Sequence, residues 1–158
     1  MHPLLPHYVG QADALHHAVR GLSHANLVAL PSKGDASLGT WTIKEVVVHV
    51  WHSDLAATHR MTRVAAEDKP LLIAYDESAF VRTLRYNEVD THTVCELFKL
   101  NRLHTGEMLK RLPDEAFART GVHNQRGTVS LGDLVGMYVQ HVEHHLGFIA
   151  RKRAALGL

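Results

Sequence analysis

The sequence predicts an all-α protein, a four-helix bundle with crossover connections. Four long stretches place apolar residues at helical spacing, and no stretch alternates apolar and polar residues convincingly, as strands do. No internal repeat is present. The later connections are about 20 residues long, whereas a plain up-and-down bundle uses about 2–8. We therefore expect connections that cross the bundle or cover a site.

Length and composition predict one domain that spans residues 1–158. Hydrophobic residues make up 46% of the chain and charged residues 21%, as in ordinary globular proteins. The formal charge of +1 offers no attraction for a nucleic-acid backbone. No run approaches the roughly 18 apolar residues of a membrane span, and the start lacks the pattern of a signal peptide. We expect a cytoplasmic protein that binds neither nucleic acid nor membrane.

The first two helices are predicted from their spacing and end signals. The first is expected over residues 5–29, ended by Pro31 and the polar stretch 32–35. The second opens at Thr42, which forms a capping box with Glu45, and continues to about residue 66. The stretch 68–70 ends it.

The second half of the chain contains a short helix and two long ones. The short helix is expected near residues 77–84, inside a connection that runs from 71 to 90. Asp90 or Thr91 then caps a helix that continues to about residue 111. Pro113 and Gly121 bracket an irregular segment, and residues 127–130 lead into the last helix, expected over 131–155.

The 14 histidines are unusually many for 158 residues, and histidine is the commonest metal ligand. Helical geometry at about 100° per residue sorts those of the last helix. Its apolar stripe consists of Leu131, Val135, Tyr138, Val142 and Ile149. His145 lies inside this stripe and His141 at its edge, whereas His144 lies on the polar face. His141 and His145 are therefore expected to point toward the core.

Three of the histidines are candidate metal ligands. His141 and His145 are one turn apart, so their rings can converge on one ion. His49 lies at the shoulder of the core stripe of the second helix, while His52 faces away. Three neutral imidazoles with a vacant fourth position are a recurring form of catalytic zinc site. Spacing alone also allows three core histidines whose nitrogens make ordinary hydrogen bonds.

The residues around these histidines resemble the DinB superfamily. The run from Trp41 to Val50, followed by Ser53 and Asp54, resembles the W-[ST]-x-x-[EQ]-V-x-x-H signature of that superfamily's second helix. The run from His141 to Leu146, with Ile149, resembles its closing H-x-x-x-H helix. The middle of the chain resembles the YfiT-like branch of metal-dependent hydrolases. The shared residues there are Tyr75-Asp76-Glu77, Leu112-Pro113-Asp114-Glu115, Arg119-Thr120, His123 and Gly127.

This resemblance implies a four-helix bundle with crossed connections and a metal held by His49, His141 and His145. Members of the superfamily bind zinc or nickel, so the expected cofactor is a divalent metal, with zinc preferred and nickel as the alternative. Some members are S-transferases or isomerases that depend on low-molecular-weight thiols. Dimers are common among them, and a homodimer is expected here.

Three functions remain open for such a site. Water in the vacant position would have its pKa lowered to about 7, which favours hydrolysis of a small molecule. A low-molecular-weight thiol in the same position would become a thiolate nucleophile for transfer or isomerisation. A non-catalytic bundle that binds a metal or ligand is the third candidate, although a structural zinc normally has four protein ligands.

Other residues are interpreted more simply. Asp54 falls on the core stripe, where it either orients a ligand or substrate or forms hydrogen bonds between helices; it is not counted as catalytic. Trp41 is expected to fill the core and Cys95 to be a small buried apolar residue. Arg82, Arg85 and Tyr86 could bind an anionic substrate, but solvated surface is favoured. No site is predicted at His16, His17, His24, His59, His92 or His104.

Overall fold

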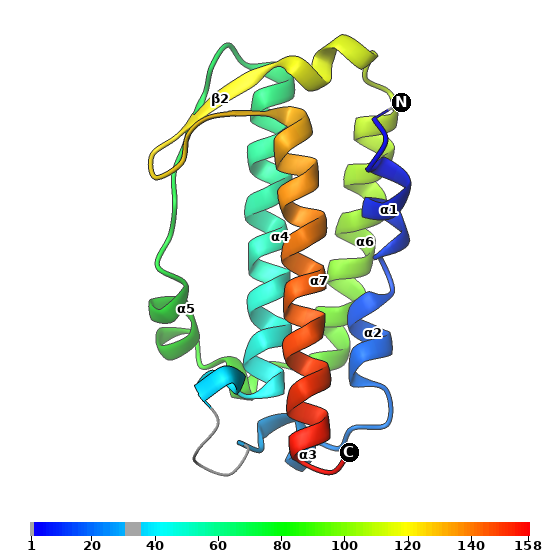
Figure 1. Cartoon of the computed structure of the whole chain (residues 1–158), viewed down its shortest axis with the longest axis vertical. Helices are drawn as coiled ribbons and strands as arrows, with labels where there is room; N and C mark the ends of the chain where they lie inside the picture. The colour runs from blue at the N-terminus through cyan, green and yellow to red at the C-terminus, as the bar shows by residue number, and fades with distance from the viewer. Residues whose placement is uncertain (1, 31–35) are drawn as a thin grey trace.

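The computed structural model of the chain, which describes residues 2–30 and 36–158, is a four-helix bundle. Three long helices form most of it: α4 (Ile43–Ala66), α6 (Thr91–Lys110) and α7 (Leu131–Ala155). Two short helices, α1 (Leu5–Gly10) and α2 (Ala14–Val19), stack end to end and complete it, as Figure 1 shows. The predicted fold class is confirmed, and the bounds of the last helix agree with the prediction.

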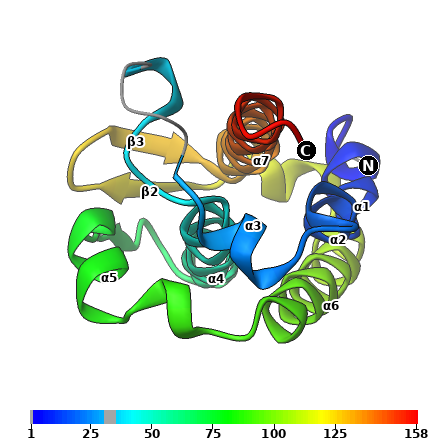
Figure 2. The ribbon, with the colours of Figure 1, turned by 90° about the horizontal axis from the view of Figure 1, so that it is seen from below.

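The order of the helices around the bundle shows which connections cross it. Helix α4 packs against α6 and α7, and α1 and α2 also pack against α6 and α7. The α1–α2 pair and α4 therefore occupy opposite corners, and so do α6 and α7, as the end-on view in Figure 2 shows. The chain crosses the bundle diagonally both before α4 and after α6. These two diagonal connections confirm the predicted crossovers, whereas residues 67–90 join the neighbouring helices α4 and α6 and include the short helix α5 (Glu77–Thr83).

The predicted first helix over residues 5–29 is wrong, because this segment is divided into α1, α2 and a third helix, α3 (His24–Val28). Gly21 has a φ of +77°, a backbone conformation that ends the helical path before α3. Ser23 then caps α3 through a capping box with Asn26. Between α1 and α2 the side-chain oxygen of Gln11 accepts a hydrogen bond from Arg102. The predicted end at Pro31 and residues 32–35 lies outside the described residues.

The connections carry short elements that cover one side of α4 and α7. A short helix, α5 (Glu77–Thr83), confirms the predicted one, and single 3-10 turns lie at η1 (Ala36–Leu38), η2 (Tyr86–Glu88) and η3 (Asp114–Ala118). Strands β2 (Thr120–His123) and β3 (Gly127–Ser130) form an antiparallel hairpin, and β1 (Leu71–Leu72) pairs with β2 in parallel. Figure 2 shows the hairpin and α5 on the same side of the bundle.

This small sheet corrects the expectation of a chain without strands. Its strands are two to four residues long, too short for alternation to stand out in the sequence. Leu71 pairs with Val122, so the sheet depends on a contact between distant segments. Pairing of this kind is decided by the tertiary structure, because no local pattern encodes it.

The buried apolar residues form two clusters with polar side chains between them. The upper cluster lies at the end of the bundle where α6 ends and α7 begins, which is the upper end in Figure 1, and includes Leu5, Met61, Leu109 and Leu131. The lower cluster includes Leu15, Val47, Phe98 and Ile149. Each corner of the bundle contributes a polar residue at the level between them. These are Gln11, Asp54, Arg102 and His141.

Candidate metal centre

Helix α4 places His49 at the polar level of the bundle. The helix begins where it was predicted to, because the Thr42 hydroxyl accepts from the Glu45 amide at 3.1 Å and the Glu45 carboxylate accepts from the Thr42 amide at 2.8 Å. His49 follows about two turns later, between the buried residues Val48 and Val50. Its side chain is only 2% exposed. His49 was predicted at the shoulder of the core stripe, and in the structure its side chain is buried and faces α7.

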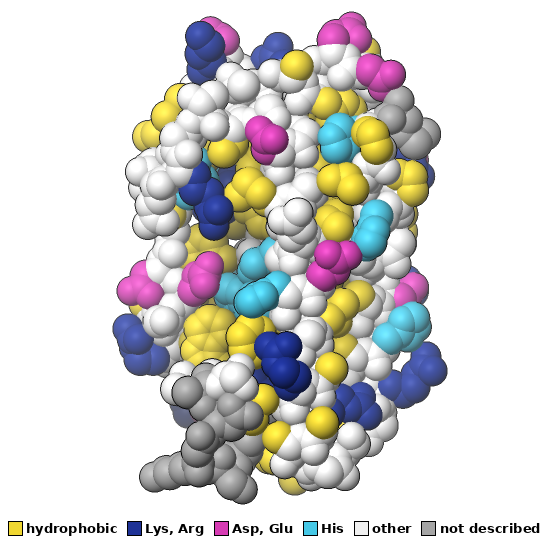
Figure 3. Space-filling model, viewed as in Figure 1, with side chains coloured by type: hydrophobic (Ala, Val, Ile, Leu, Met, Phe, Trp, Pro, Cys, Tyr) yellow, Lys and Arg dark blue, Asp and Glu magenta, His cyan; other side chains and the backbone are white. Residues whose placement is uncertain are grey.

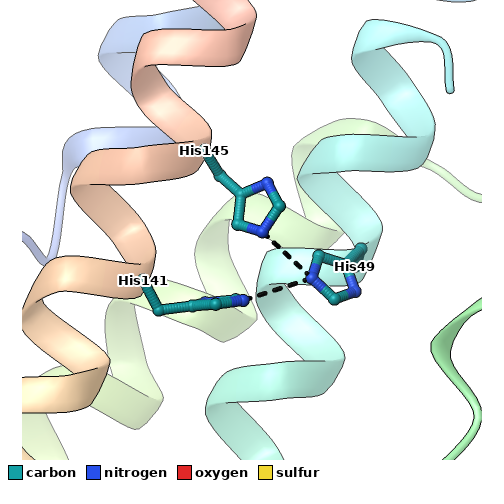
Figure 4. A group of neighbouring side chains, drawn as sticks. All are labelled: His49, His141 and His145. Atoms are coloured by element: carbon teal, nitrogen blue, oxygen red, sulfur yellow. Dashed lines mark hydrogen bonds between the residues drawn. The ribbon is translucent and has the colours of Figure 1, made fainter. Parts of the chain in front are cut away.

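Helix α7 supplies two more imidazoles, as Figure 4 shows. His141 and His145 lie one turn apart and point toward His49 from the neighbouring helix. The Nε2 atom of His49 lies 3.2 Å from Nε2 of His141 and 3.2 Å from Nε2 of His145. One ring nitrogen from each of the three lies within 4.8 Å of the others. The structure therefore brings together the three histidines selected from the sequence.

The spacing of these nitrogens fits a shared metal ion. Two ligands at about 2.1 Å from one ion lie about 3.0 Å apart in octahedral geometry and about 3.4 Å apart in tetrahedral geometry. Ordinary hydrogen bonding accounts for the group less well, because Nε2 of a neutral imidazole carries either one hydrogen or one lone pair, and Nε2 of His49 faces two partners. Among the described residues, the buried Nδ1 atoms of His141 and His145 have no hydrogen-bond partner.

Burial keeps the three imidazoles neutral. Desolvation and the nearby His52 lower the pKa of His49 to about 4. Burial lowers the pKa of His141 to about 2 and that of His145 to about 3, and neighbouring histidines add to both shifts. A neutral imidazole retains the lone pair that a metal requires. The centre is therefore prepared to bind a cation near neutral pH.

The two histidines expected to point away from the core behave differently. His144 is exposed, as predicted, although it borders the hollow next to His141. His52 is half-buried rather than solvated, because its Nδ1 atom lies within hydrogen-bond distance of the Tyr86 hydroxyl and its ring contacts Phe80. Tyr86 is 1% exposed, which corrects its placement on the solvated surface. The turn η2 covers this side of α4 and explains both differences.

A polar hollow of about 350 Å³ opens beside His141. Its walls come from α4, α7, the start of α5 and the β2–β3 hairpin, and Figure 3 shows it as an opening with Lys and Arg atoms on one side and histidine atoms on the other. Glu77 lies in this wall, with Oε2 4.0 Å from Nε2 of His49. Burial raises the pKa of Glu77, against the lowering effect of Arg126 and Arg60. A carboxylate therefore stands within reach of the three imidazoles.

A second hollow, of about 310 Å³, borders His145. Trp41 and Phe148 form its apolar walls, and Lys152 lies at its edge. Trp41 packs against the lower apolar cluster, as expected, and its ring centre also lies 5.0 Å from that of His49. The three imidazoles are thus flanked by a polar hollow and a more apolar one.

Asp54 forms a buried ion pair between two helices, which decides between its two interpretations. Its Oδ1 atom accepts from Nε of Arg102 at 2.8 Å, and both side chains are 1% exposed. Its Oδ2 atom accepts from the Asn101 amide at 2.6 Å. Burial raises the pKa of Asp54, and both partners counteract this rise. Both carboxylate oxygens therefore bind residues of α6, and Asp54 forms hydrogen bonds between helices, as the second interpretation expected.

The remaining candidates are mostly as expected. Cys95 is buried, and burial raises the pKa of its thiol to about 12, which excludes a thiolate nucleophile near neutral pH. Arg82 and Arg85 are exposed. The expectation of no grouping at His16 and His92 needs correction, because their ring nitrogens and a carboxylate oxygen of Glu96 lie within 4.8 Å of one another.

Sequence reasoning did not identify three residues of the polar hollow as functional. Glu77 occurs in the tripeptide at residues 75–77 that carries part of the family resemblance, and that signal could have indicated it. Arg60 and Arg126 carried no signal, because they reach the hollow from α4 and from the turn between β2 and β3. Their proximity arises from the crossover connections.

A crossed four-helix bundle in which two helices bring three neutral imidazoles to the edge of a polar hollow defines a class of protein with a potential open metal centre. The chain belongs to the DinB superfamily, whose family model matches residues 7–149. This match covers the α1–α2 segment, both histidine-bearing helices and the connections between them.

Similar proteins agree with this assignment. A relative from Oceanobacillus iheyensis is 29% identical over 114 residues, covering 70% of this chain and 64% of its own. YfiT of Bacillus subtilis is 26% identical over 120 residues, covering 75% and 67%. Both are named "Putative metal-dependent hydrolase". The aligned part thus spans about two thirds of the length of these relatives, and slightly less in the first.

Two solved structures share the fold. The structure of Bacillus subtilis YfiT, described as having an unusual four-helix bundle topology, aligns with a TM-score of 0.86 over 97% of this chain and 86% of its own, at 24% identity. A mycothiol-dependent maleylpyruvate isomerase aligns with a TM-score of 0.68 over 92% of this chain and 58% of its own, at 15% identity. These likenesses establish the crossed bundle.

Proposed function

We propose that this protein is a divalent-metal-dependent enzyme that hydrolyses a small molecule, with the metal bound by His49, His141 and His145. The observation that carries the proposal is the convergence of three neutral imidazoles beside an accessible hollow, with Nε2 of His49 lying 3.2 Å from Nε2 of each of the other two. The names of the relatives support it. Zinc is the preferred ion, because tri-histidine sites with a vacant position are typical of catalytic zinc, and nickel is the alternative.

Each group at the centre has a distinct part in this proposal. The three imidazoles hold the ion, which when bound supplies a Lewis acid that lowers the pKa of water or a thiol in the vacant position. The Glu77 carboxylate, at the edge of the centre, accepts the proton released there. The polar hollow next to His141 holds the substrate and limits its orientation.

The metal proposal is tested by elemental analysis of purified protein. We expect about one zinc or nickel ion per chain. His145→Ala should abolish binding, while His144→Ala, one residue earlier on the exposed face, should leave it nearly intact. His16→Ala controls for the separate grouping with His92 and Glu96 and should also retain the ion. Equal loss in the His144 and His145 variants would contradict the proposed ligand set.

A thiol-dependent S-transferase or isomerase is the second candidate. Two hollows flank the imidazoles, one polar and one more apolar, an arrangement that suits a thiol and an electrophile on opposite sides. The fold similarity to a mycothiol-dependent isomerase also favours it.

Adding a low-molecular-weight thiol separates the candidates. Turnover of an electrophile only with thiol supports the transferase, and cleavage of esters or amides without it supports the hydrolase. Metal-loaded protein inactive in both assays would indicate a non-catalytic binding protein.

Glu77 provides a second test of the enzyme proposal. Replacing Glu77 with Gln removes the proton acceptor while keeping its shape, so kcat should fall about 10²-fold or more. The metal content should not change, because the three imidazoles alone are proposed as ligands. Asp76→Asn, at the adjacent helix cap, is the matched control. Loss of the metal in Glu77→Gln would instead indicate that Glu77 is a metal ligand. An unchanged kcat would exclude Glu77 both as the proton acceptor and as a ligand.

Two further proposals concern the oligomeric state of the protein and its location in the cell. We propose a homodimer, which light scattering would detect as twice the chain mass of 17.6 kDa. No helix in the described part of the chain is both long and apolar enough to cross a lipid bilayer. A cytoplasmic location is proposed from the sequence, and fractionation of cells that express the protein would test it.

A further inference from the structure

The polar hollow beside the imidazoles has an excess of positive charge. Arg60 and Arg126 both line it, and Glu77 is its only carboxylate among the described lining residues. The histidines in the wall are His123, His141 and His144. Burial lowers the pKa of His123, and the two nearby arginines lower it further. A cation bound by the three imidazoles would add to this excess.

The two arginines are held differently. Arg60 is fixed in the wall, because its guanidinium donates to the Tyr138 hydroxyl and to the carbonyl of Ile73. Arg126 lies in the exposed turn between β2 and β3, where its backbone N–H donates to the carbonyl of His123. Within the described residues, the Arg126 guanidinium has no ion-pair partner. One cation is thus held in place by hydrogen bonds, and the other lies in the same wall without an ion pair that a ligand would have to break.

We propose that this hollow binds the carboxylate of an anionic substrate through Arg126 and Arg60, with the rest of the molecule directed toward the three imidazoles. This inference rests on the proposed function, because it names the substrate class of the same centre. The planar guanidinium fork matches the two oxygens of a carboxylate. The volume of about 350 Å³ suits a small molecule with a few carbon atoms beyond the carboxylate.

The test uses the metal-loaded protein with succinate, inorganic phosphate and neutral succinamide as probes, measured by calorimetry at low salt. We expect succinate to bind, succinamide to bind far more weakly, and Arg126→Gln to weaken succinate binding about tenfold or more. Arg126→Lys should recover part of the loss. Arg111→Gln, which removes an exposed arginine outside the hollow, should have no effect.

Other outcomes separate this inference from the proposed function. Equal succinate affinity in wild type and Arg126→Gln, or equal binding of succinate and succinamide, would overturn the carboxylate site. Tighter binding of phosphate than of succinate would overturn the assignment to a carboxylate. If the wild-type protein fails to load a metal but binds succinate in an Arg126-dependent way, the metal proposal fails and the anion site stands.

Discussion

At the residue scale, the three imidazoles combine deep burial with neighbours of the same kind. His49 is 2% exposed, and its nearest ring neighbours are two further histidines and Trp41. A positive charge there would lose its hydration, and His52 lies close enough to disfavour it further. The protein therefore disfavours protonation of this residue, and the metal-free form should show this in its stability.

Metal-free protein should become less stable as the pH falls from about 6.5 to about 4. Burial lowers the pKa of His49 to about 4 in the folded state, so the unfolded chain takes up its proton first. Stability then falls by up to about 1.4 kcal/mol per pH unit from this residue. Urea denaturation in the presence of a chelator measures the slope. His49→Gln should reduce the slope without abolishing it, because burial also lowers the pKa of His141 and His145. His59→Gln, which removes an exposed histidine of the same helix, should leave the slope unchanged.

Residue types and spacing could identify the imidazoles but not the groups around them. His141 and His145 are one helical turn apart, and the apolar stripe of α7 predicted that both side chains point toward the core. Glu77 and Arg126 lie in connections whose course the sequence pattern did not define. Their positions depend on the course of these two connections, so only the folded structure could identify them.

At the element scale, α1 packs closely on α6 at Gly106. A Cβ atom at this position would clash with a methyl group of Val9. Glycine is unfavourable inside a helix by about 1 kcal/mol relative to alanine. It is tolerated in α6 because it lets the short helix α1 approach. The sequence pattern could not predict this close packing of the two helices, because Val9 and Gly106 are far apart in the chain.

Gly106→Ala should destabilise the protein by about 1 kcal/mol, because overpacking of about 1–3 kcal/mol exceeds the helix-propensity gain. Gly10→Ala is the matched control, since a Cβ there has no atom within 4 Å and should be neutral or slightly stabilising. Thermal unfolding of both variants measures the difference. The additional change Val9→Ala should reduce the cost of Gly106→Ala, and strict additivity would contradict this packing.

At the scale of the whole molecule, Arg102 joins all parts of the bundle at the polar level. From α6 its guanidinium donates to Asp54 of α4, to Gln11 between α1 and α2, and to the carbonyl of Tyr138 in α7. It also lies 4.0 Å from the centre of the Tyr8 ring. The side chain is fully buried. A buried charge with this many partners specifies how the helices fit together.

Arg102→Met should destabilise the protein by about 3–5 kcal/mol, because it leaves the Asp54 carboxylate buried without its cation. The double variant Asp54→Asn with Arg102→Met should be more stable than Arg102→Met alone, since the uncompensated charge is gone. Arg111→Met, an exposed change on the same chain segment, should stay within about 0.5 kcal/mol of wild type. Urea denaturation measures all three. A single-variant cost below 1 kcal/mol would contradict the role of Arg102.

The sequence by itself determined the class of fold, the bounds of α4, α6 and α7, and the three imidazoles, because helix caps and helical periodicity are local signals. Only the tertiary structure decided the division of residues 5–29, the small sheet, the pairing of Asp54 with Arg102, and the charged hollow beside His141. These features depend on groups that are distant in the chain, and no local pattern records which of them will meet.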